Sequence, residues 1–330
     1  MSLNRRVFLR NISLASMAGI QPFIARKIHA AVQGTTHFYL PGTGGELWSE
    51  VALQDRTVMQ SFGFDNANGY IFTLQLTYGG GDGDLTLTKL SLSGEKLGYM
   101  LLTGFGHGVS IGVEPVGDST YLWTEVDSVG SGADARGVRI GRFEFVNGAT
   151  LDTTSSSITK YTFVSGSTVN TCNIDPVYNR LILRYDDSGT MKFNIYDLND
   201  VKVNGDSATV LARYSDRTTG TPQGYCLYDS YIYSLAGTAY EYCPGSDDRN
   251  VNNMTIFEFD TNPPNALTTF VTGIGASYDY REPEGMAIQW TNYPNTDAPE
   301  VRLTIGFARE ADCSSSVKYA TIFYKDQLVS

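Results

Sequence analysis

One polar residue recurs at the same place in five similar segments of this chain, next to small and apolar neighbours. The segments are MQSFGFD from Met59, GHGVSIGVE from Gly106, VNTCNID from Val169, PQGYCLYD from Pro222 and PEGMAIQW from Pro283. The residues in register are Gln60, His107, Asn170, Gln223 and Glu284, spaced 47, 63, 53 and 61 residues apart. Together they offer an imidazole, a carboxyl group and three amides, which can transfer protons and hydrogen-bond sugar hydroxyls.

His107 is the member of this register best suited to proton transfer, because the ordinary pKa of histidine lies close to neutral pH. Glycines flank it in the segment GFGHG that starts at Gly104. They would let the backbone approach a ligand closely and leave the imidazole unhindered. The alternative is an axial histidine that hydrogen-bonds the backbone of a neighbouring repeat.

Arg184 and Tyr185, at the end of RLILRYDD, complete the groups that a lyase for uronic-acid polymers needs. Such an enzyme uses a cation to neutralise the carboxylate beside the acidic C–H, plus a base and an acid, often His and Tyr. Arg184 or Arg309 would be the cation, and His107 with Tyr185 the base and acid. Successive strand residues point to opposite faces, so Arg184 and Tyr185 share one site only at a strand end.

Glu284 and Glu125 suggest a different reaction, because two carboxyl groups that face one cleft can hydrolyse a glycosidic bond. That reaction requires a separation of about 5 to 9.5 Å, which no sequence specifies. Glu284 could instead pair with Arg281 or Arg309. Lyase chemistry is slightly preferred, since the register holds one histidine and only one carboxyl group.

A third hypothesis is a non-catalytic module that binds glycan or mediates adhesion. The expected ligand contacts are amides of the register together with an indole and a guanidinium: Gln60, Asn170, Gln223, Trp123 and Arg309. Aromatic rings stack on sugars and also fill the cores of all-β folds. The abundance of Tyr and Trp therefore supports cleavage and binding equally.

Repeats of this length built only from strands are typical of β-propeller blades, whose first strands surround a central axis. Each repeat divides into four strand-like segments, except the fifth, which has three: GMAIQW, VRLTIGFA and KYATIFYK. Residues 36–40 would supply the missing strand by pairing with residues 318–325. We predict an all-β, five-bladed propeller closed by its mature N-terminal strand; the main alternative is a β-sandwich.

Residues 1–31 are predicted to be a twin-arginine export signal, and residues 32–330 a single propeller domain. Arg5 and Arg6 lie in the motif NRRVFLR, which is followed by a weakly apolar run and by small residues around Ala30. The alternative is a short amphipathic anchor that stays uncleaved. Export by this route would deliver the folded chain to the periplasm or beyond, without a membrane span once the signal is removed.

The remaining chain is strongly acidic. Without residues 1–31 it keeps 19 Lys+Arg against 35 Asp+Glu, a net charge of about −16. Such a chain is not expected to bind nucleic acid over a broad face, and an anionic ligand would need a local cationic pocket. We expect a monomer whose partner is a polysaccharide or cell-envelope glycopolymer.

The four cysteines lack the spacing of a zinc site. Cys243 and Cys313 follow the second strands of the fourth and fifth repeats, so adjacent loops could bring them together. We predict a disulfide between these two residues in an exported chain, and buried thiols at Cys172 and Cys226.

The glycine-rich segment 79–84 contains two carboxylates, Asp82 and Asp84, that could bind a structural calcium ion. It lacks the longer ligand pattern of a dedicated calcium loop, so a flexible hairpin is the preferred interpretation. No other metal or cofactor is expected, because phosphate loops and dinucleotide fingerprints are absent.

The run from Gln60 to Val126 resembles the propeller family named after teichoic acid biosynthesis protein C, which also includes receptor-binding domains of phage tail proteins. The resemblance rests on QSFGFD, KLSLSGEKLGYMLLTGFGHGVSIGVEP and YLWTEV, and it is weak after the second repeat. It implies a five-bladed propeller that acts at a cell envelope, and it carries over no catalytic residues. The leading hypothesis is cleavage of an extracellular or envelope polysaccharide at the central funnel, with glycan binding as the alternative.

Overall fold

The computed structural model describes residues 36–243, 246–247, 252–262, 265–310 and 316–330, which belong to one compact unit. The predicted all-β, five-bladed propeller is confirmed, because five sheets of four to six strands follow one another along the chain. The predicted export signal lies outside the described residues. No helix among the described residues is long and apolar enough to cross a membrane.

Within the first four blades the first strand begins the sheet and the later strands follow outward. The first blade contains β3 (Met59–Asp65), β4 (Tyr70–Leu76), β5 (Leu85–Ser91) and β6 (Lys96–Thr103), with β10 (Thr150–Asp152) added parallel to β6. The second contains β7 (Gly112–Val116), β8 (Ser119–Val129), β9 (Arg136–Glu144) and β11 (Thr159–Tyr161). The third contains β12 (Asn170–Asp175), β13 (Arg180–Asp187), β14 (Thr190–Asp197) and β15 (Val210–Ser215).

The fourth blade contains β16 (Pro222–Tyr228), β17 (Tyr231–Gly237), β20 (Met254–Asp260) and β21 (Leu267–Val271). The fifth contains β22 (Tyr280–Trp290), β23 (Val301–Glu310), β24 (Lys318–Lys325) and β2 (Gly44–Val51), with β18 (Tyr240–Cys243) and β19 (Ser246–Asp247) beside β22. A short helix, α1 (Leu198–Asn204), follows β14, and the Asp197 side chain caps it by accepting a bond from the Asp200 N–H. Two 3-10 turns, Gly132–Asp134 and Gly205–Ser207, complete the described elements.

Five separate hydrophobic clusters fill the five gaps between neighbouring blades. Phe72 and Leu122 belong to the cluster between the first and second blades, and Trp123 and Leu183 to the next. The remaining clusters include Ile182 with Leu227, Cys226 with Ile305, and Phe62 with Ile322. The abundant Tyr and Phe therefore serve blade packing, since large rings bury much apolar surface at each interface.

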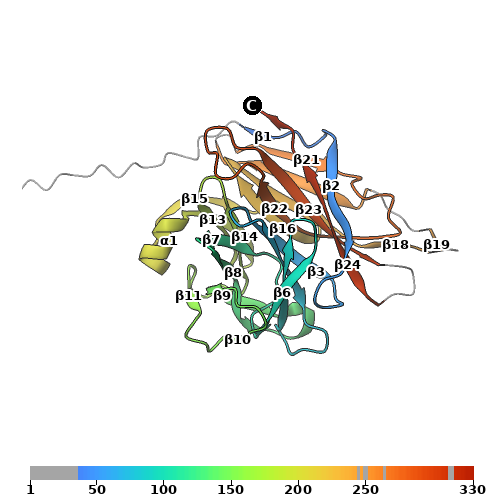
Figure 1. Cartoon of the computed structure of the whole chain (residues 1–330). Coiled ribbons are helices and arrows are strands. Elements are labelled where there is room, and N and C mark those ends of the chain that lie inside the picture. Colours follow the sequence, from blue (N-terminus) through green and yellow to red (C-terminus); the bar gives the residue numbers. More distant parts are fainter. Residues whose placement is uncertain (1–35, 244–245, 248–251, 263–264, 311–315) are drawn as a thin grey trace, which may run out of the picture. The chain divides into compact units, whose positions relative to one another are not determined.

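The strand that closes the ring is β2, and this corrects one detail of the sequence-based prediction. We expected residues 36–40 to pair with β24, but β24 pairs with β2 (Figure 1). In this pairing Trp48 lies opposite Ile322. The earlier segment instead forms β1 (His37–Phe38), which pairs with β25 (Leu328–Val329). Phe38 is held there because its ring packs against Tyr228 and Tyr233 of the fourth blade.

Cys172 and Cys226 are buried free thiols, as predicted. Burial raises the pKa of both thiols, so neither is a ready nucleophile at neutral pH. The predicted Cys243–Cys313 disulfide involves Cys313, which lies outside the described residues. It stays a prediction, which peptide mapping without reduction tests: a cross-linked Cys243–Cys313 peptide supports it, and two free thiols at these positions contradict it.

Candidate functional site

The inner strands of the five blades contact one another around the axis through short side chains and glycines. Ser61 donates to the Gly108 carbonyl at 2.6 Å, and Ser110 donates to the Cys172 carbonyl at 2.8 Å. Further around the ring, Thr171 bonds the Tyr225 hydroxyl at 3.0 Å. A Cβ at Gly224 would lie 2.6 Å from the Gly285 Cα, and one at Gly285 would lie 3.0 Å from the Ser61 Cα. These close approaches explain why a small residue, such as Ser61, Gly224 or Gly285, follows the polar residue of the register.

The polar register found in the sequence corresponds to a recurring structural feature in three blades. The pairing of the inner strand with the second strand shifts at Gln60, Gln223 and Glu284, so each of these residues lies at a β-bulge. Bulges re-aim side chains and are common beside functional sites. The register therefore marks the end of each inner strand where a site would be expected.

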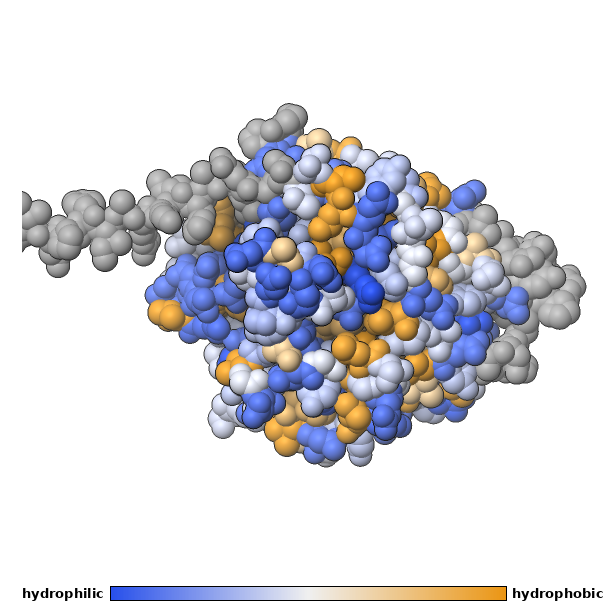
Figure 2. Space-filling model, turned by 45° about the horizontal axis from the view of Figure 1, so that its top comes forward, coloured by the Kyte–Doolittle hydropathy of each residue, from blue (hydrophilic) through white to orange (hydrophobic). Residues whose placement is uncertain are grey.

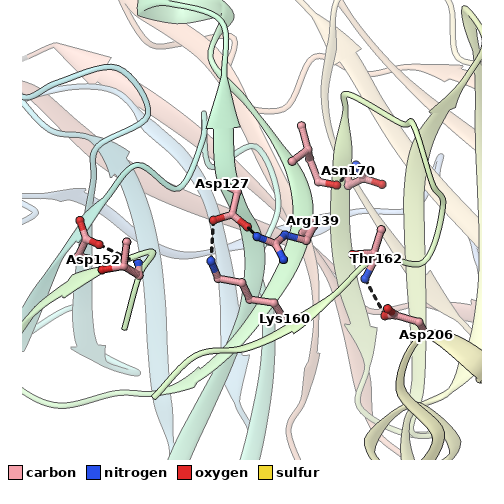
Figure 3. Close-up of polar contacts among 9 residues, drawn as sticks. Asp127, Arg139, Asp152, Lys160, Thr162, Asn170 and Asp206 are labelled. Carbon is pink, nitrogen blue, oxygen red and sulfur yellow. Dashed lines mark hydrogen bonds and ion pairs between the residues drawn. The ribbon is translucent and has the colours of Figure 1, made fainter. Parts of the chain in front are cut away.

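The amides of the register mostly bond to the protein's own backbone. Asn170 donates to the Val138 carbonyl at 3.0 Å and thereby joins the second and third blades. Gln223 donates to the Gly237 carbonyl at 3.1 Å, and Gln60 is buried. Figure 3 shows Asn170 near a separate group of polar contacts, in which Asp127 pairs with Arg139 and with Lys160.

A cavity of about 120 Å³ opens at this end of the inner strands of the second, third and fourth blades. Its walls come mainly from residues one or two positions away from the register residues His107, Asn170 and Gln223. The lining includes Val109, Val169, Thr171, Pro222, Gly224, Tyr225 and Ser234, together with Arg136, Arg184 and Thr218. Because strand residues alternate between faces, the cavity is lined by the neighbours of the residues that we predicted.

Arg184 lines this cavity and Tyr185 does not. In the pairing of β12 with β13, Arg184 lies opposite Thr171, and Tyr185 lies opposite Asn170. Tyr185 is buried in the cluster between the second and third blades, and its hydroxyl donates to Asn194 at 3.2 Å. Arg184 and Tyr185 therefore point to opposite faces of β13, as alternation along a strand requires. The structure separates the two groups proposed as lyase cation and acid.

Glu125 is fully buried, and its carboxylate accepts three backbone N–H groups. Oε1 accepts from His107 at 3.1 Å and Gly108 at 2.8 Å, and Oε2 accepts from Gly137 at 2.6 Å. Burial raises its pKa, while these N–H groups and the charge of Arg136 oppose the rise. The arrangement makes Glu125 a structural group that ties the His107 segment to β9.

Gly106, directly before His107, makes room for Glu125 rather than for a ligand. A Cβ at Gly106 would lie 2.3 Å from Glu125 Oε2, at a φ of +156°, so only glycine fits. His107 itself is half-buried in the irregular segment before β7. The close approach that we expected is therefore present, but it is made to a carboxylate of the same chain.

Glu284 is buried close to the axis, and no hydrogen bond reaches its carboxyl group from the described residues. Burial raises its pKa well above the ordinary value, and the neighbouring Glu282 acts in the same direction. The neutral acid is therefore favoured, which does not suit a nucleophile. Among the residues that line the cavity described above, neither Glu284 nor Glu125 is present.

The pKa of Glu284 predicts a pH-dependent stability. A carboxyl whose pKa is raised on folding stabilises the protein below its unfolded pKa of about 4.3, and this contribution is lost as the pH rises through the folded pKa. We expect Glu284→Gln to raise the free energy of unfolding at neutral pH and to leave it unchanged near pH 4. Urea titrations across this range test it, with the exposed Glu144→Gln as control; coincident pH profiles of Glu284→Gln and wild type would contradict it.

Two residues predicted to bind substrate lie elsewhere. Trp123 is fully buried, donates to Glu114 at 2.8 Å and stacks on Tyr161, so it presents no free face to a sugar. Arg309 lies on the fifth blade, where it pairs with Glu50 at 2.8 Å and covers the ring of Tyr278. Arg184 is thus the only residue of the predicted site that lines the cavity, within the described part of the chain.

Polar residues that line the cavity but were not predicted from the sequence include Arg136, Thr171, Thr218 and Tyr225. Thr171 is adjacent to the register residue Asn170, so testing both faces of each inner strand would have identified it. Arg136 is the first residue of β9 and Thr218 follows β15, and neither belongs to a recurring sequence pattern. They reach the cavity because of how β9 and the segment after β15 are placed.

The segment 79–84 uses its carboxylates in hydrogen bonds to backbone. Asp84 accepts from the Gly81 N–H at 2.8 Å and from the Gly104 N–H at 2.9 Å. Asp82 accepts from the Gly132 N–H at 2.6 Å, which links the first and second blades. These bonds account for both carboxylates, and structural calcium at this place stays a prediction.

Comparison with known proteins gives one family and several similar chains. Residues 58–311 match the phage five-bladed β-propeller receptor-binding platform domain. The chain is 28% identical over 293 residues to the putative major teichoic acid biosynthesis protein C of Bacillus subtilis (strain 168), covering 85% of this chain and 63% of that relative.

Solved structures show more distant similarity. A neuraminidase-like protein of subtype N11, from A/flat-faced bat/Peru/033/2010, is 11% identical with a TM-score of 0.43, covering 83% of this chain and 90% of the other. A chain of a nidogen/laminin complex is 11% identical with a TM-score of 0.38, covering 81% and 80%. The family match spans all five inner strands, and the blade count agrees with it. The chain therefore belongs to the phage five-bladed β-propeller receptor-binding platform family.

Proposed function

We propose that this chain is an envelope or extracellular glycan-binding platform, and that its ligand enters the cavity between the second, third and fourth blades. The observation that carries the proposal is the cavity itself, at the ends of the inner strands of the second, third and fourth blades, with arginine and hydroxyl side chains in its walls. The chain is a five-bladed propeller related to a teichoic acid biosynthesis protein and to phage receptor-binding domains. The teichoic acid relative supports an envelope glycopolymer as the partner, and the phage family supports a receptor-binding role.

Binding is preferred to cleavage because the groups proposed for acid–base chemistry do not share one site. The Glu125 carboxylate is occupied by three N–H groups, and Tyr185 is inside the core. General acid–base catalysis needs both groups within hydrogen-bonding reach of the reacting atoms. The lyase hypothesis through His107 and Arg184 stays a prediction, and we place it second.

The surface is compatible with a polar ligand. On the face shown in Figure 2, hydrophilic residues predominate, and the hydrophobic ones form only short strips. A broad apolar area, which would favour a hydrophobic protein partner, is not visible on that face. A glycan suits such a surface because it binds through hydrogen bonds and small apolar contacts.

A panel of envelope polymers tests the proposal. Wild-type protein is incubated with phosphodiester polymers, uronic-acid polymers and neutral glycans, and retention on the immobilised polymer is measured together with reducing ends and absorbance of unsaturated uronates. We expect retention without either product. New reducing ends without unsaturation would indicate a hydrolase, unsaturated uronates a lyase, and no retention of any polymer would contradict the proposed function.

A further inference from the structure

We propose that the cavity binds an anionic group of the polymer, a phosphodiester or a carboxylate, through Arg184 and Arg136. This inference rests on the proposed function and names the chemistry of its ligand. The chain carries a net charge of −11, so attraction of an anion must come from a local concentration of cations. Two guanidinium groups line one small cavity, which supplies that concentration.

Arg184 is positioned by Asp216 in a way that leaves part of its guanidinium for a ligand. The Nε of Arg184 donates to Asp216 Oδ2 at 2.7 Å. Asp216 is the single hydrogen-bond partner of this guanidinium group among the described residues. The contact engages one edge of the fork, and the Nη groups remain. Guanidinium is the side-chain group that best matches the paired oxygens of phosphate and carboxylate.

Asp216 also positions a hydroxyl group beside Arg184. Its Oδ1 accepts from the Thr218 N–H at 2.9 Å, so one carboxylate orients both cavity residues. The Thr218 Oγ1 is buried and has no hydrogen-bond partner among the described residues. A buried hydroxyl without a partner is unfavourable, and an anion in the cavity would accept its proton.

A second hydroxyl pair continues the cavity wall. Thr171 and the Tyr225 hydroxyl bond each other at 3.0 Å, and the Ser110 hydroxyl is a further partner of Tyr225. Burial raises the pKa of Tyr225, which keeps its hydroxyl protonated at neutral pH. Guanidinium and hydroxyl donors on several sides match an oxyanion, whose oxygens are acceptors only.

The size of the cavity fits one substituent rather than a chain of sugars. Pockets that enclose a whole small-molecule ligand usually measure about 300 to 1,000 Å³, and this cavity measures about 120 Å³. A phosphate or carboxylate group would enter while the attached sugars lie outside. Specificity would then come from the anion, with the rest of the polymer contacting the surrounding loops.

The test measures polymer affinity with poly(glycerol phosphate) and polygalacturonate as separate probes and neutral dextran as reference. We expect wild type to bind at least one anionic polymer more tightly than dextran, and the preferred probe distinguishes phosphodiester from carboxylate. Arg184→Gln should weaken that binding at least about tenfold, since a hydrogen-bonded charge contact is worth about that factor. Thr218→Val should weaken it by about tenfold as well, while the midpoint of thermal unfolding stays the same or rises.

Arg142→Gln is the matched control, because Arg142 also donates through Nε to a carboxylate at 2.8 Å, is 18% exposed compared with 15% for Arg184, and does not line the cavity. The affinity of Arg142→Gln for the anionic polymer should remain within about threefold of wild type. If Arg184→Gln and Thr218→Val bind the anionic polymers as wild type does, or if dextran binds as tightly, the inference fails and the proposed function stands. If wild type binds none of the polymers, both fail.

Discussion

Replacing Glu125 with Ala should lower the free energy of unfolding by about 3 kcal/mol or more, because three buried N–H groups would lose their acceptor at about 1–3 kcal/mol each. The donors are the backbone N–H groups of His107, Gly108 and Gly137, and the carboxylate that they bind is fully buried. Urea denaturation of both proteins at neutral pH measures the difference. The free energy of unfolding of Glu125→Gln should lie between those of wild type and Glu125→Ala, since its one carbonyl oxygen still accepts hydrogen bonds.

Glu144→Ala is the control for Glu125→Ala, because Glu144 is exposed on the same blade and its side chain accepts, among the described residues, from Ser119 alone. It should change stability by no more than about 0.5 kcal/mol. A Glu125→Ala protein as stable as wild type but without activity toward a glycan would assign Glu125 to catalysis and contradict the structural role. This comparison separates the two roles that the sequence left open.

The second large effect is expected at the closing strand. Trp48→Ala should cost about 3 to 5 kcal/mol, the usual range for removing a large aromatic ring from a core. Trp48 is buried on β2 and packs in the cluster that joins the fifth and first blades, opposite Ile322. Weakening β2 also exposes the edge of β24, so aggregation should increase with protein concentration.

Trp48→Phe should be milder, because the ring remains and the buried Nε1–H, which has no partner among the described residues, is removed. Val203→Ala on helix α1 serves as control, since Val203 is 80% exposed. The midpoint of thermal unfolding should be lowest for Trp48→Ala, higher for Trp48→Phe and nearest to wild type for Val203→Ala. If Trp48→Ala unfolds at the same temperature as Val203→Ala, then β2 does not close the ring.

The blade number was predictable because strands and turns are local features that recur at a regular spacing. The identity of the closing strand was not. Residues 36–40 and β2 both have strand-like sequences, and the choice between them depends on distant partners: Phe38 packs on the fourth blade, while Trp48 packs against β24. Such contacts join opposite ends of the chain and leave no local pattern.

The place of the cavity along the chain lies one or two residues from the predicted register, but the side chains that line it could not be predicted. The register lies at the end of the inner strands where the cavity opens, yet alternation put Thr171 and Arg184 in the cavity and left Asn170 and Tyr185 on the other face. Which face is exposed depends on strand pairing and on bulges. In the same way, Gly106 beside His107 signalled a close approach, and only the tertiary structure identified Glu125 as the approaching group.

The central claim is that ligand binds in the cavity at the ends of the inner strands of the second, third and fourth blades. Hydrogen–deuterium exchange with and without bound poly(glycerol phosphate), or the polymer that the panel retains in its place, tests this claim most directly. We predict slower exchange in peptides that contain Val169, Thr171 and Thr218, which line the cavity, and no change at residues 176–179, in the turn between β12 and β13 at the opposite end of the inner strand. Slower exchange at that turn, with none around the cavity, would contradict the account.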